Sequence, residues 1–235
     1  TGVEKVNTVS ACLGGTLMSM LLAYCAQRGD DLVETATLLN THTDFSEPGT
    51  LGVFVDDDAV SALERRMART GYLDAKEMAH TFDALRANDL IFRYAQNGWL
   101  LGERPPSFDL LVWNADSTRM PAHMHSQYLR SCYLENRFAK GEFEIDGYKL
   151  DPGAVTAEAY VVGAIGDHIV PWGSAHTTSQ LLGGTNRFVL SSSGHIAGIV
   201  NPPSPKAKYW TNDGAGSGDA ETWYAGAQLH KETWW

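Results

Sequence analysis

Three residues far apart in the sequence have the types that nucleophilic catalysis requires: Cys12, Asp167 and His195. A free cysteine thiol has a pKa of about 8.5 and is mostly protonated at neutral pH, so a reactive cysteine needs a base within hydrogen-bond distance. Histidine supplies that base, and a carboxylate holds the imidazole in the tautomer that accepts the thiol proton. The three types therefore predict acyl transfer through a covalent adduct on Cys12.

The residues around Cys12 predict how its thiol is positioned. A short apolar strand from Val3 to Ser10 runs into Cys12, and a strongly apolar helix opens at Leu13. Such a sharp strand-to-helix turn is the nucleophile elbow of the α/β-hydrolase fold, whose motif Gly-x-Ser-x-Gly corresponds here to Ser10-Ala11-Cys12-Leu13-Gly14. The helix N-terminus favours the thiolate, and the backbone N–H of Leu13 is the expected oxyanion donor.

The positions of Asp167 and His195 predict the same fold. Each follows a later predicted strand, Ala159–Gly163 for the aspartate and Arg187–Leu190 for the histidine. The chain order of nucleophile, acid and histidine is that of the α/β-hydrolase fold. Residues 1–40, which carry the elbow and a second strand at Val33–Leu39, and residues 153–235 are therefore predicted to form an α/β core.

Residues 41–152 have a different sequence pattern, with acidic helical segments interrupted by prolines and glycines. This pattern predicts an inserted, mainly helical cap or lid subdomain. No strand is predicted before Val3, so the early strands of the sheet and the second oxyanion donor are expected to lie outside this chain. The sequence is thus interpreted as the catalytic part of a larger protein, with a partial α/β-hydrolase sheet.

Composition excludes several classes of function. The 18 Lys and Arg residues against 28 Asp and Glu residues give a net charge of −10, which argues against a nucleic-acid partner. The longest apolar stretch, Thr16 to Ala26, is about half the ~20 residues that a transmembrane helix needs. The three cysteines have no spacing typical of a zinc site or a disulfide framework, so a reducing compartment is expected and no metal is assigned.

Motifs along nearly the whole chain are similar to those of class I polyhydroxyalkanoate synthases. They begin with Ala11-Cys12-Leu13-Gly14-Gly15-Thr16, Thr43-Asp44-Phe45, Leu51-Gly52-Val53-Phe54-Val55-Asp56 and Leu85-Arg86-Ala87-Asn88-Asp89-Leu90-Ile91. They continue with Phe108-Asp109-Leu110-Leu111-Val112-Trp113-Asn114-Ala115-Asp116-Ser117-Thr118, Asp167-His168-Ile169-Val170-Pro171-Trp172, Ser193-Gly194-His195-Ile196-Ala197-Gly198 and Asn201-Pro202-Pro203. Ser10 departs from the usual glycine of this family.

The resemblance implies an acyltransferase that polymerises short (R)-3-hydroxyacyl groups from coenzyme A into a polyester. Cys12 would carry the growing chain, His195 would activate it, and Asp167 would support His195 or help to activate the 3-hydroxyl group. No cofactor is implied, because coenzyme A is part of the substrate. The resemblance also implies a homodimer in the cytoplasm, at the surface of polyester granules.

Two other interpretations remain open. One is a cysteine-dependent thioesterase or lactone hydrolase on the same fold, and the other is an inactive granule-surface fragment. A cysteine nucleophile favours acyl transfer, because a thioester on Cys12 keeps the acyl group activated for transfer to an alcohol.

Other side chains receive weaker predictions. Cys25 and Cys132 are expected to be core thiols, and His123 and His125 a polar pair. His168 is expected to position the loop beside Asp167, with a direct catalytic role as the alternative. Candidates for coenzyme A binding are Arg86, Arg93 and Arg119, and residues that either line a channel or belong to the core are Trp99, Trp113, Trp172, Tyr128 and Tyr133.

Overall fold

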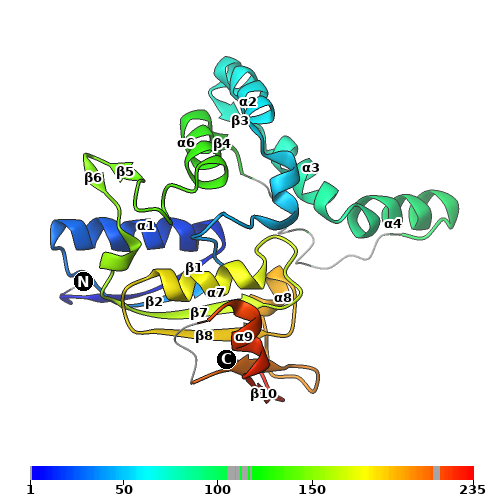
Figure 1. Cartoon of the computed structure of the whole chain (residues 1–235). Coiled ribbons are helices and arrows are strands. Elements are labelled where there is room, and N and C mark those ends of the chain that lie inside the picture. The colour runs from blue at the N-terminus through cyan, green and yellow to red at the C-terminus, as the bar shows by residue number, and fades with distance from the viewer. Residues whose placement is uncertain (1, 105–108, 110–111, 113–115, 117, 214–217) are drawn as a thin grey trace. The chain divides into compact units, whose positions relative to one another are not determined.

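The computed structural model describes residues 2–104, 109, 112, 116, 118–213 and 218–235 (Figure 1). These residues form two compact units, one made of residues up to 52 together with 131–235, and the other of residues 53–130. Within the described residues, no helix is both long and apolar enough to cross a membrane. Most of the motif from Phe108 to Thr118, including Trp113, lies outside the described residues.

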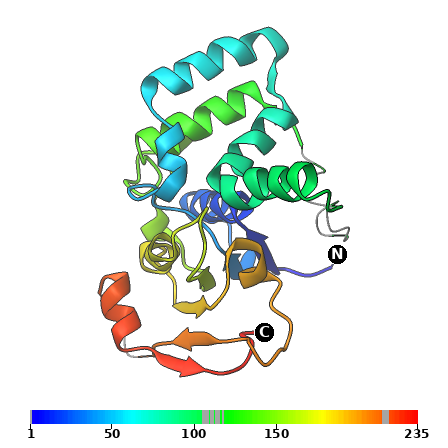
Figure 2. The ribbon, with the colours of Figure 1, turned by 90° about the vertical axis from the view of Figure 1, so that its right-hand side faces the viewer.

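The first unit is built on a six-stranded sheet in the order β1-β2-β7-β8-β9-β10. Strands β1, β2, β7 and β8 are parallel, whereas β9 and β10 run antiparallel to their neighbours, as the orange and red arrows of Figure 2 show. The strands are β1 Val6–Ala11, β2 Val33–Leu39, β7 Glu158–Ala164, β8 Asn186–Ser191, β9 Tyr209–Thr211 and β10 Gln228–His230. This mixed α/β sheet confirms the predicted fold class.

Both faces of this sheet carry apolar side chains, as parallel strands between helices require. Helices α1 (Leu13–Arg28) and α7 (Trp172–Leu181) lie on one side of it (Figure 1). Gly163 of β7 faces α7 so closely that a Cβ there would lie 3.2 Å from that of Ala175. On the opposite face, Leu39, Val162 and Val189 form a core cluster under partly buried Tyr160, Ile199, Tyr209 and Trp234.

The predicted strands agree with the observed ones to within a few residues. The bounds of β2 are those predicted, and β7 and β8 extend the predicted segments at both ends. Strand β1 starts at Val6 instead of Val3, because its pairing with β2 begins where Val6 meets Val33. Strand β1 is the edge of the described sheet, and the side chain of Val9 is 72% exposed.

The core unit extends further into the middle of the sequence than the predicted boundaries of 41 and 152. Residues 41–52 and 131–152 belong to it because their large apolar side chains are buried there, namely Phe45, Phe138 and Leu150. The smaller elements of this unit are β5 Glu144–Ile145, β6 Tyr148–Lys149, η5 Pro152–Ala154, α8 His195–Ile199 and α9 Ala220–Ala225. The chain passes between the units within η1 (Gly49–Phe54) and η4 (Leu129–Leu134).

The second unit is mainly helical, with one two-stranded sheet. Its elements are α2 Asp57–Thr70, β3 Tyr72–Leu73, α3 Ala75–Leu85, η2 Asn88–Phe92, α4 Arg93–Ala95, η3 Gln96–Leu100, β4 Met120–Pro121 and α6 Ala122–Tyr128. Asp56 caps α2 by accepting the N–H of Ala59, and Gly71 ends it in the left-handed conformation. Arg130 donates two hydrogen bonds of 2.7 Å to the carboxylate of Glu64 and so ties α2 to the end of this unit.

Candidate active site

Cys12 occupies a strained turn between β1 and α1. Its φ of 51° and ψ of −126° lie outside the regions that non-glycine residues ordinarily adopt, at a cost of the order of 1–3 kcal/mol. Hydrogen bonds hold this geometry: the N–H of Cys12 donates to Leu39 at 2.9 Å, and its carbonyl accepts from Gly15 at 2.9 Å. The thiol is therefore held at the start of α1, as predicted for a nucleophile elbow.

Close packing explains why residue 15, the second of the two glycines after Cys12, is a glycine. A Cβ on Gly15 would lie 1.9 Å from the Oγ1 of Thr41, whereas one on Gly14 would meet no atom within 4 Å. The first turn of α1 thus approaches the loop after β2 closely at Gly15. Leu13 is the first residue of α1, so its N–H is among the terminal amides that donate to no intrahelical carbonyl.

The carboxylate of Asp167 is fully buried and hydrogen-bonded at both oxygens. Its Oδ1 accepts the backbone N–H groups of Ile169 at 2.8 Å and Val170 at 2.9 Å. Its Oδ2 lies 2.6 Å from Nδ1 of His195, and the Asp167 side chain is 0% exposed. These contacts fix the carboxylate in one orientation with the imidazole on one side of it.

His195 lies between the carboxylate and the thiol. It begins the short helix α8, its side chain is 6% exposed, and it hydrogen-bonds to both Asp167 and the Cys12 side chain. Burial lowers the pKa of His195, but the hydrogen bonds and charge interactions with Asp167 and Cys12 outweigh it and raise the pKa to about 9. The imidazolium form of His195 is therefore favoured, and the three residues form one continuous hydrogen-bonded chain.

The loop after β2 reaches the same place, which the sequence interpretation missed. The side chain of Asn40 is buried, and its Nδ2 donates a hydrogen bond of 2.5 Å to the backbone carbonyl of His195. His42 is 3% exposed, and burial, the main cause, lowers its pKa to about 4 although Asp167 and Asp44 oppose that change. The available signal was a run of polar residues directly after a buried strand, at the carboxyl edge of a parallel sheet.

The remaining predicted residues differ in their burial. His168 is partly exposed in the same loop as Asp167, and its role stays a prediction. Cys25 and Cys132 are buried, and burial raises the pKa of both thiols, that of Cys132 to about 12. His125 is buried and His123 exposed, and the described residues contain no cluster of three metal-binding side chains.

The predicted substrate-contact residues lie in different parts of the chain. Arg86, Arg93 and Arg119 all belong to the second unit, where the Arg119 guanidinium lies 4.5 Å from the centre of the Tyr72 ring. In the core unit, Trp172 packs on Tyr224 at 5.8 Å, and Tyr133 packs on Phe45 at 4.8 Å. Their part in binding substrate stays a prediction, as does that of Trp99 and Tyr128.

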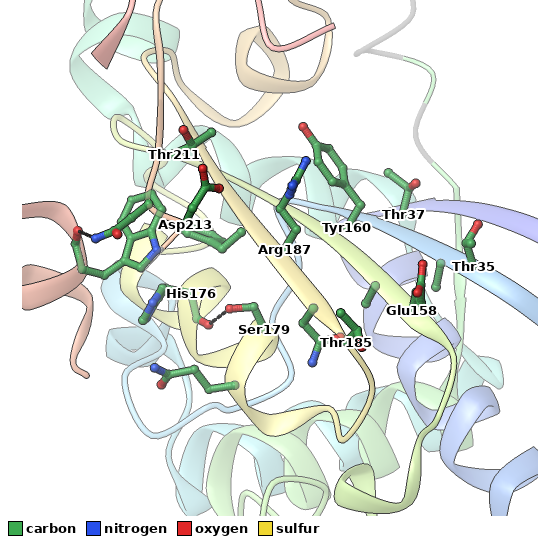
Figure 3. A pocket seen from close by; sticks show the side chains of 17 residues that line it. Thr35, Thr37, Glu158, Tyr160, His176, Ser179, Thr185, Arg187, Thr211 and Asp213 are labelled. Carbon is green, nitrogen blue, oxygen red and sulfur yellow. Dashed lines mark hydrogen bonds between the residues drawn. The ribbon is translucent and has the colours of Figure 1, made fainter. Parts of the chain in front are cut away.

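A cavity of about 740 Å³ lies elsewhere in the core unit (Figure 3). Thr37, Tyr160 and Arg187, which pair in register on β2, β7 and β8, lie along it together with side chains of α7 such as His176 and Ser179. None of Cys12, Asp167 and His195 lines this cavity. The hydrogen-bonded chain, rather than this cavity, therefore locates the candidate active site.

Comparisons with known proteins agree with this geometry. Residues 1–202 match the family model of the alpha/beta hydrolase fold. Over its whole length the chain is 49% identical to a poly(3-hydroxyalkanoate) polymerase subunit PhaC of Rhizobium meliloti, 45% to a poly(3-hydroxyalkanoate) polymerase of Methylorubrum extorquens and 40% to a PhaC subunit of Cupriavidus necator. It spans 38%, 39% and 41% of those proteins, respectively.

These matches confirm the resemblance recognised in the sequence motifs. They extend over 100% of the chain, including the second unit. The family match covers the elbow, the aspartate and the histidine, all of which lie within residues 1–202. The chain therefore belongs to the α/β hydrolase fold family.

Proposed function

We propose that this chain carries the acyl-transfer site of a poly(3-hydroxyalkanoate) polymerase, which builds polyester from 3-hydroxyacyl-coenzyme A. The observation that carries the proposal is the hydrogen-bonded series Cys12, His195 and Asp167 on an α/β-hydrolase core. The similarity of the whole chain to named polymerases supports the choice of substrate class.

In the first step Cys12 transfers its thiol proton to His195, and the Cys12 sulfur attacks the thioester carbonyl of the substrate. The Leu13 N–H stabilises the developing oxyanion. The carbon–sulfur bond to coenzyme A breaks, and the departing thiolate takes the proton from the His195 imidazolium. The products are an acyl thioester on Cys12 and free coenzyme A, so one thioester is exchanged for another.

In the second step a 3-hydroxyl group attacks the Cys12 thioester and gives its proton to His195. An ester bond forms, the Cys12 sulfur leaves, and the proton on His195 returns to it. The contacts of Asp167 favour a supporting role for it in both steps, since Oδ1 accepts two backbone N–H groups and Oδ2 faces His195. Of the two roles predicted for Asp167, we therefore propose support of His195.

The test uses the natural protein that contains this chain, with Cys12→Ala and Cys25→Ala compared as the same change at a catalytic and a packing position. We expect Cys12→Ala to abolish coenzyme A release from 3-hydroxybutyryl-coenzyme A and Cys25→Ala to retain it. Insoluble polyester identifies a polymerase, whereas soluble 3-hydroxy acid identifies the hydrolase alternative. Undiminished release by Cys12→Ala would overturn the proposal, and an inert parent protein would favour the granule-surface alternative.

Further parts of the proposal follow from the polymerase assignment. We expect a homodimer in the cytoplasm that associates with the surface of polyester granules, and no cofactor beyond the coenzyme A of the substrate. Sedimentation of the purified protein tests the dimer, and the distribution of a fluorescent fusion in polyester-accumulating cells tests the location.

A further inference from the structure

We infer that Asn40 is a positioning residue that holds His195, through its backbone, at proton-transfer distance from Cys12. The inference rests on the proposed role of the three residues in acyl transfer. It adds a fourth residue that contacts no reacting atom and that the motifs of the sequence do not mark.

The contacts of Asn40 fix it between a strand of the sheet and the catalytic histidine. Its backbone N–H donates to the carbonyl of Val162 on β7 at 2.7 Å, and its Nδ2 donates to the carbonyl of His195 at 2.5 Å. The side chain is 0% exposed. Burying an amide is unfavourable unless it is hydrogen-bonded, and the bond to His195 provides that compensation.

The backbone of Asn40 explains why an asparagine suits this position. Its φ of 47° is left-handed, a conformation that asparagine tolerates better than most residues other than glycine. Within the described residues, the Oδ1 of Asn40 has no hydrogen-bond partner. The His195 carbonyl is therefore the contact that the amide group makes, rather than one member of a larger polar network.

Helix α8 depends on outside contacts to hold its place. It has only five residues, and its N-cap residue Gly194 supplies no side-chain hydrogen bond. Gly198 of α8 lies so close to the loop that a Cβ there would be 3.4 Å from Nδ2 of Asn40. Asn40 thus bonds to the first residue of α8 and leaves little room for a side chain at the fourth.

The residues beside Asn40 hold the other side of the site. The carbonyl of Leu39 accepts the N–H of Cys12 at 2.9 Å, and the carbonyl of His42 accepts the hydroxyl of Thr16 at 2.5 Å. The segment from Leu39 to His42 therefore binds the nucleophile turn through its backbone and the histidine helix through the Asn40 side chain. Loss of the amide would remove one constraint on His195, in addition to its bond with Asp167, while leaving the nucleophile turn in place.

The experiment measures alkylation of Cys12 by iodoacetamide as a function of pH, in the natural protein that contains this chain. Only the thiolate reacts, so the rate reports the Cys12–His195 pair without requiring polymerase activity. Mass spectrometry of the Cys12 peptide separates this signal from other cysteines. Asn40→Gly removes the amide and keeps the left-handed turn, and Asn40→Ser has a hydroxyl donor that is one bond shorter and cannot make the same contact.

A matched control is available at Asn186. Its Nδ2 also donates to a backbone carbonyl, that of Leu182 at 2.6 Å, and its Oδ1 is also buried without a partner among the described residues. Asn186→Ala therefore removes a hydrogen bond of the same kind, away from Cys12 and His195. Its thermal midpoint calibrates the stability cost that comes from losing such a bond alone.

We expect both Asn40 variants to lower the alkylation rate at pH 7 by roughly fivefold or more and to move the pH profile upward. Asn186→Ala should keep the parent profile. If Asn40→Gly fails to fold, Asn40→Ser decides the question. Parent-like alkylation profiles in the folded Asn40 variants would overturn the inference, even if their thermal midpoints are lowered. The proposed function is tested separately, by Cys12→Ala.

Discussion

Replacing Asp167 by asparagine tests the hydrogen-bonded chain at the site most directly. In the variant the amide oxygen remains where Oδ1 is, because the N–H groups of Ile169 and Val170 at 2.8 and 2.9 Å require an acceptor. The amide nitrogen therefore replaces Oδ2 and faces Nδ1 of His195, 2.6 Å away in the parent. Two N–H groups cannot face each other at that distance, so Nδ1 must lose its proton.

The size of the effect follows from the charge state of His195. Its pKa lies at about 9 instead of 6.5, a difference worth about 3 kcal/mol that Asp167 and Cys12 contribute together. Because the folded-state pKa is raised, this stabilisation is complete below pH 6.5 and is lost as the pH rises through about 9. Asp167→Asn removes the carboxylate's share of it and excludes the imidazolium form, which carries protons on both ring nitrogens.

We expect coenzyme A release from 3-hydroxybutyryl-coenzyme A to fall by at least ~100-fold in Asp167→Asn. The wrong histidine tautomer costs on the order of 10⁴ in kcat in serine proteases, which sets the upper range. Asp219→Asn is the matched control, since Asp219 accepts the N–H of Thr222 at 2.7 Å and caps α9 without touching His195. Activity of Asp167→Asn within tenfold of the parent, with the parent's pH profile, would refute the reasoning.

Two further substitutions probe the packing and charge of the loop after β2. Gly15→Ala places a Cβ 1.9 Å from Thr41 Oγ1 and should lower the unfolding free energy, measured in urea, by about 3 kcal/mol. Gly14→Ala, which meets no atom, should be neutral or slightly stabilising. Equal urea midpoints for the two variants would contradict the packing. The pKa of His42, about 4, lies below 6.5, so the unfolded chain binds its proton first and stability falls by about 3 kcal/mol as the pH drops from 6.5 to 4. His42→Phe should remove that loss of stability in thermal melts, whereas His123→Phe, at an exposed position, should retain it. Parallel curves of stability against pH for the parent and His42→Phe would reject the assignment.

The strands and the nucleophile turn were predictable because their signals are local. The apolar and β-branched residues of Val33–Leu39 sufficed to set the bounds of β2. The strand, cysteine and helix sequence around Cys12 likewise predicted the elbow, since a sharp turn followed at once by helix is fixed by neighbouring residues. The pairing of Asp167 with His195 was predictable from chain order, because the carboxyl ends of parallel strands share one edge of the sheet.

The boundaries of the insertion and the role of the loop after β2 were not predictable in this way. The acidic helical pattern of the sequence after Leu39 suggested that the insertion begins at residue 41, but Phe45, Phe138 and Leu150 are buried in the core unit. Hydrophobic pattern gives the type of an element and leaves open which unit buries it.

The sequence by itself predicted the identity and order of the candidate catalytic groups, the strands that carry them and the resemblance that suggests their substrate. Only the tertiary structure decided that both oxygens of Asp167 are hydrogen-bonded, that His195 lies between a carboxylate and a thiol, and that Asn40 holds its carbonyl. The reason is distance along the chain. Asn40 and His195 are 155 residues apart, and sheet register and packing, rather than any local preference, bring them to 2.5 Å.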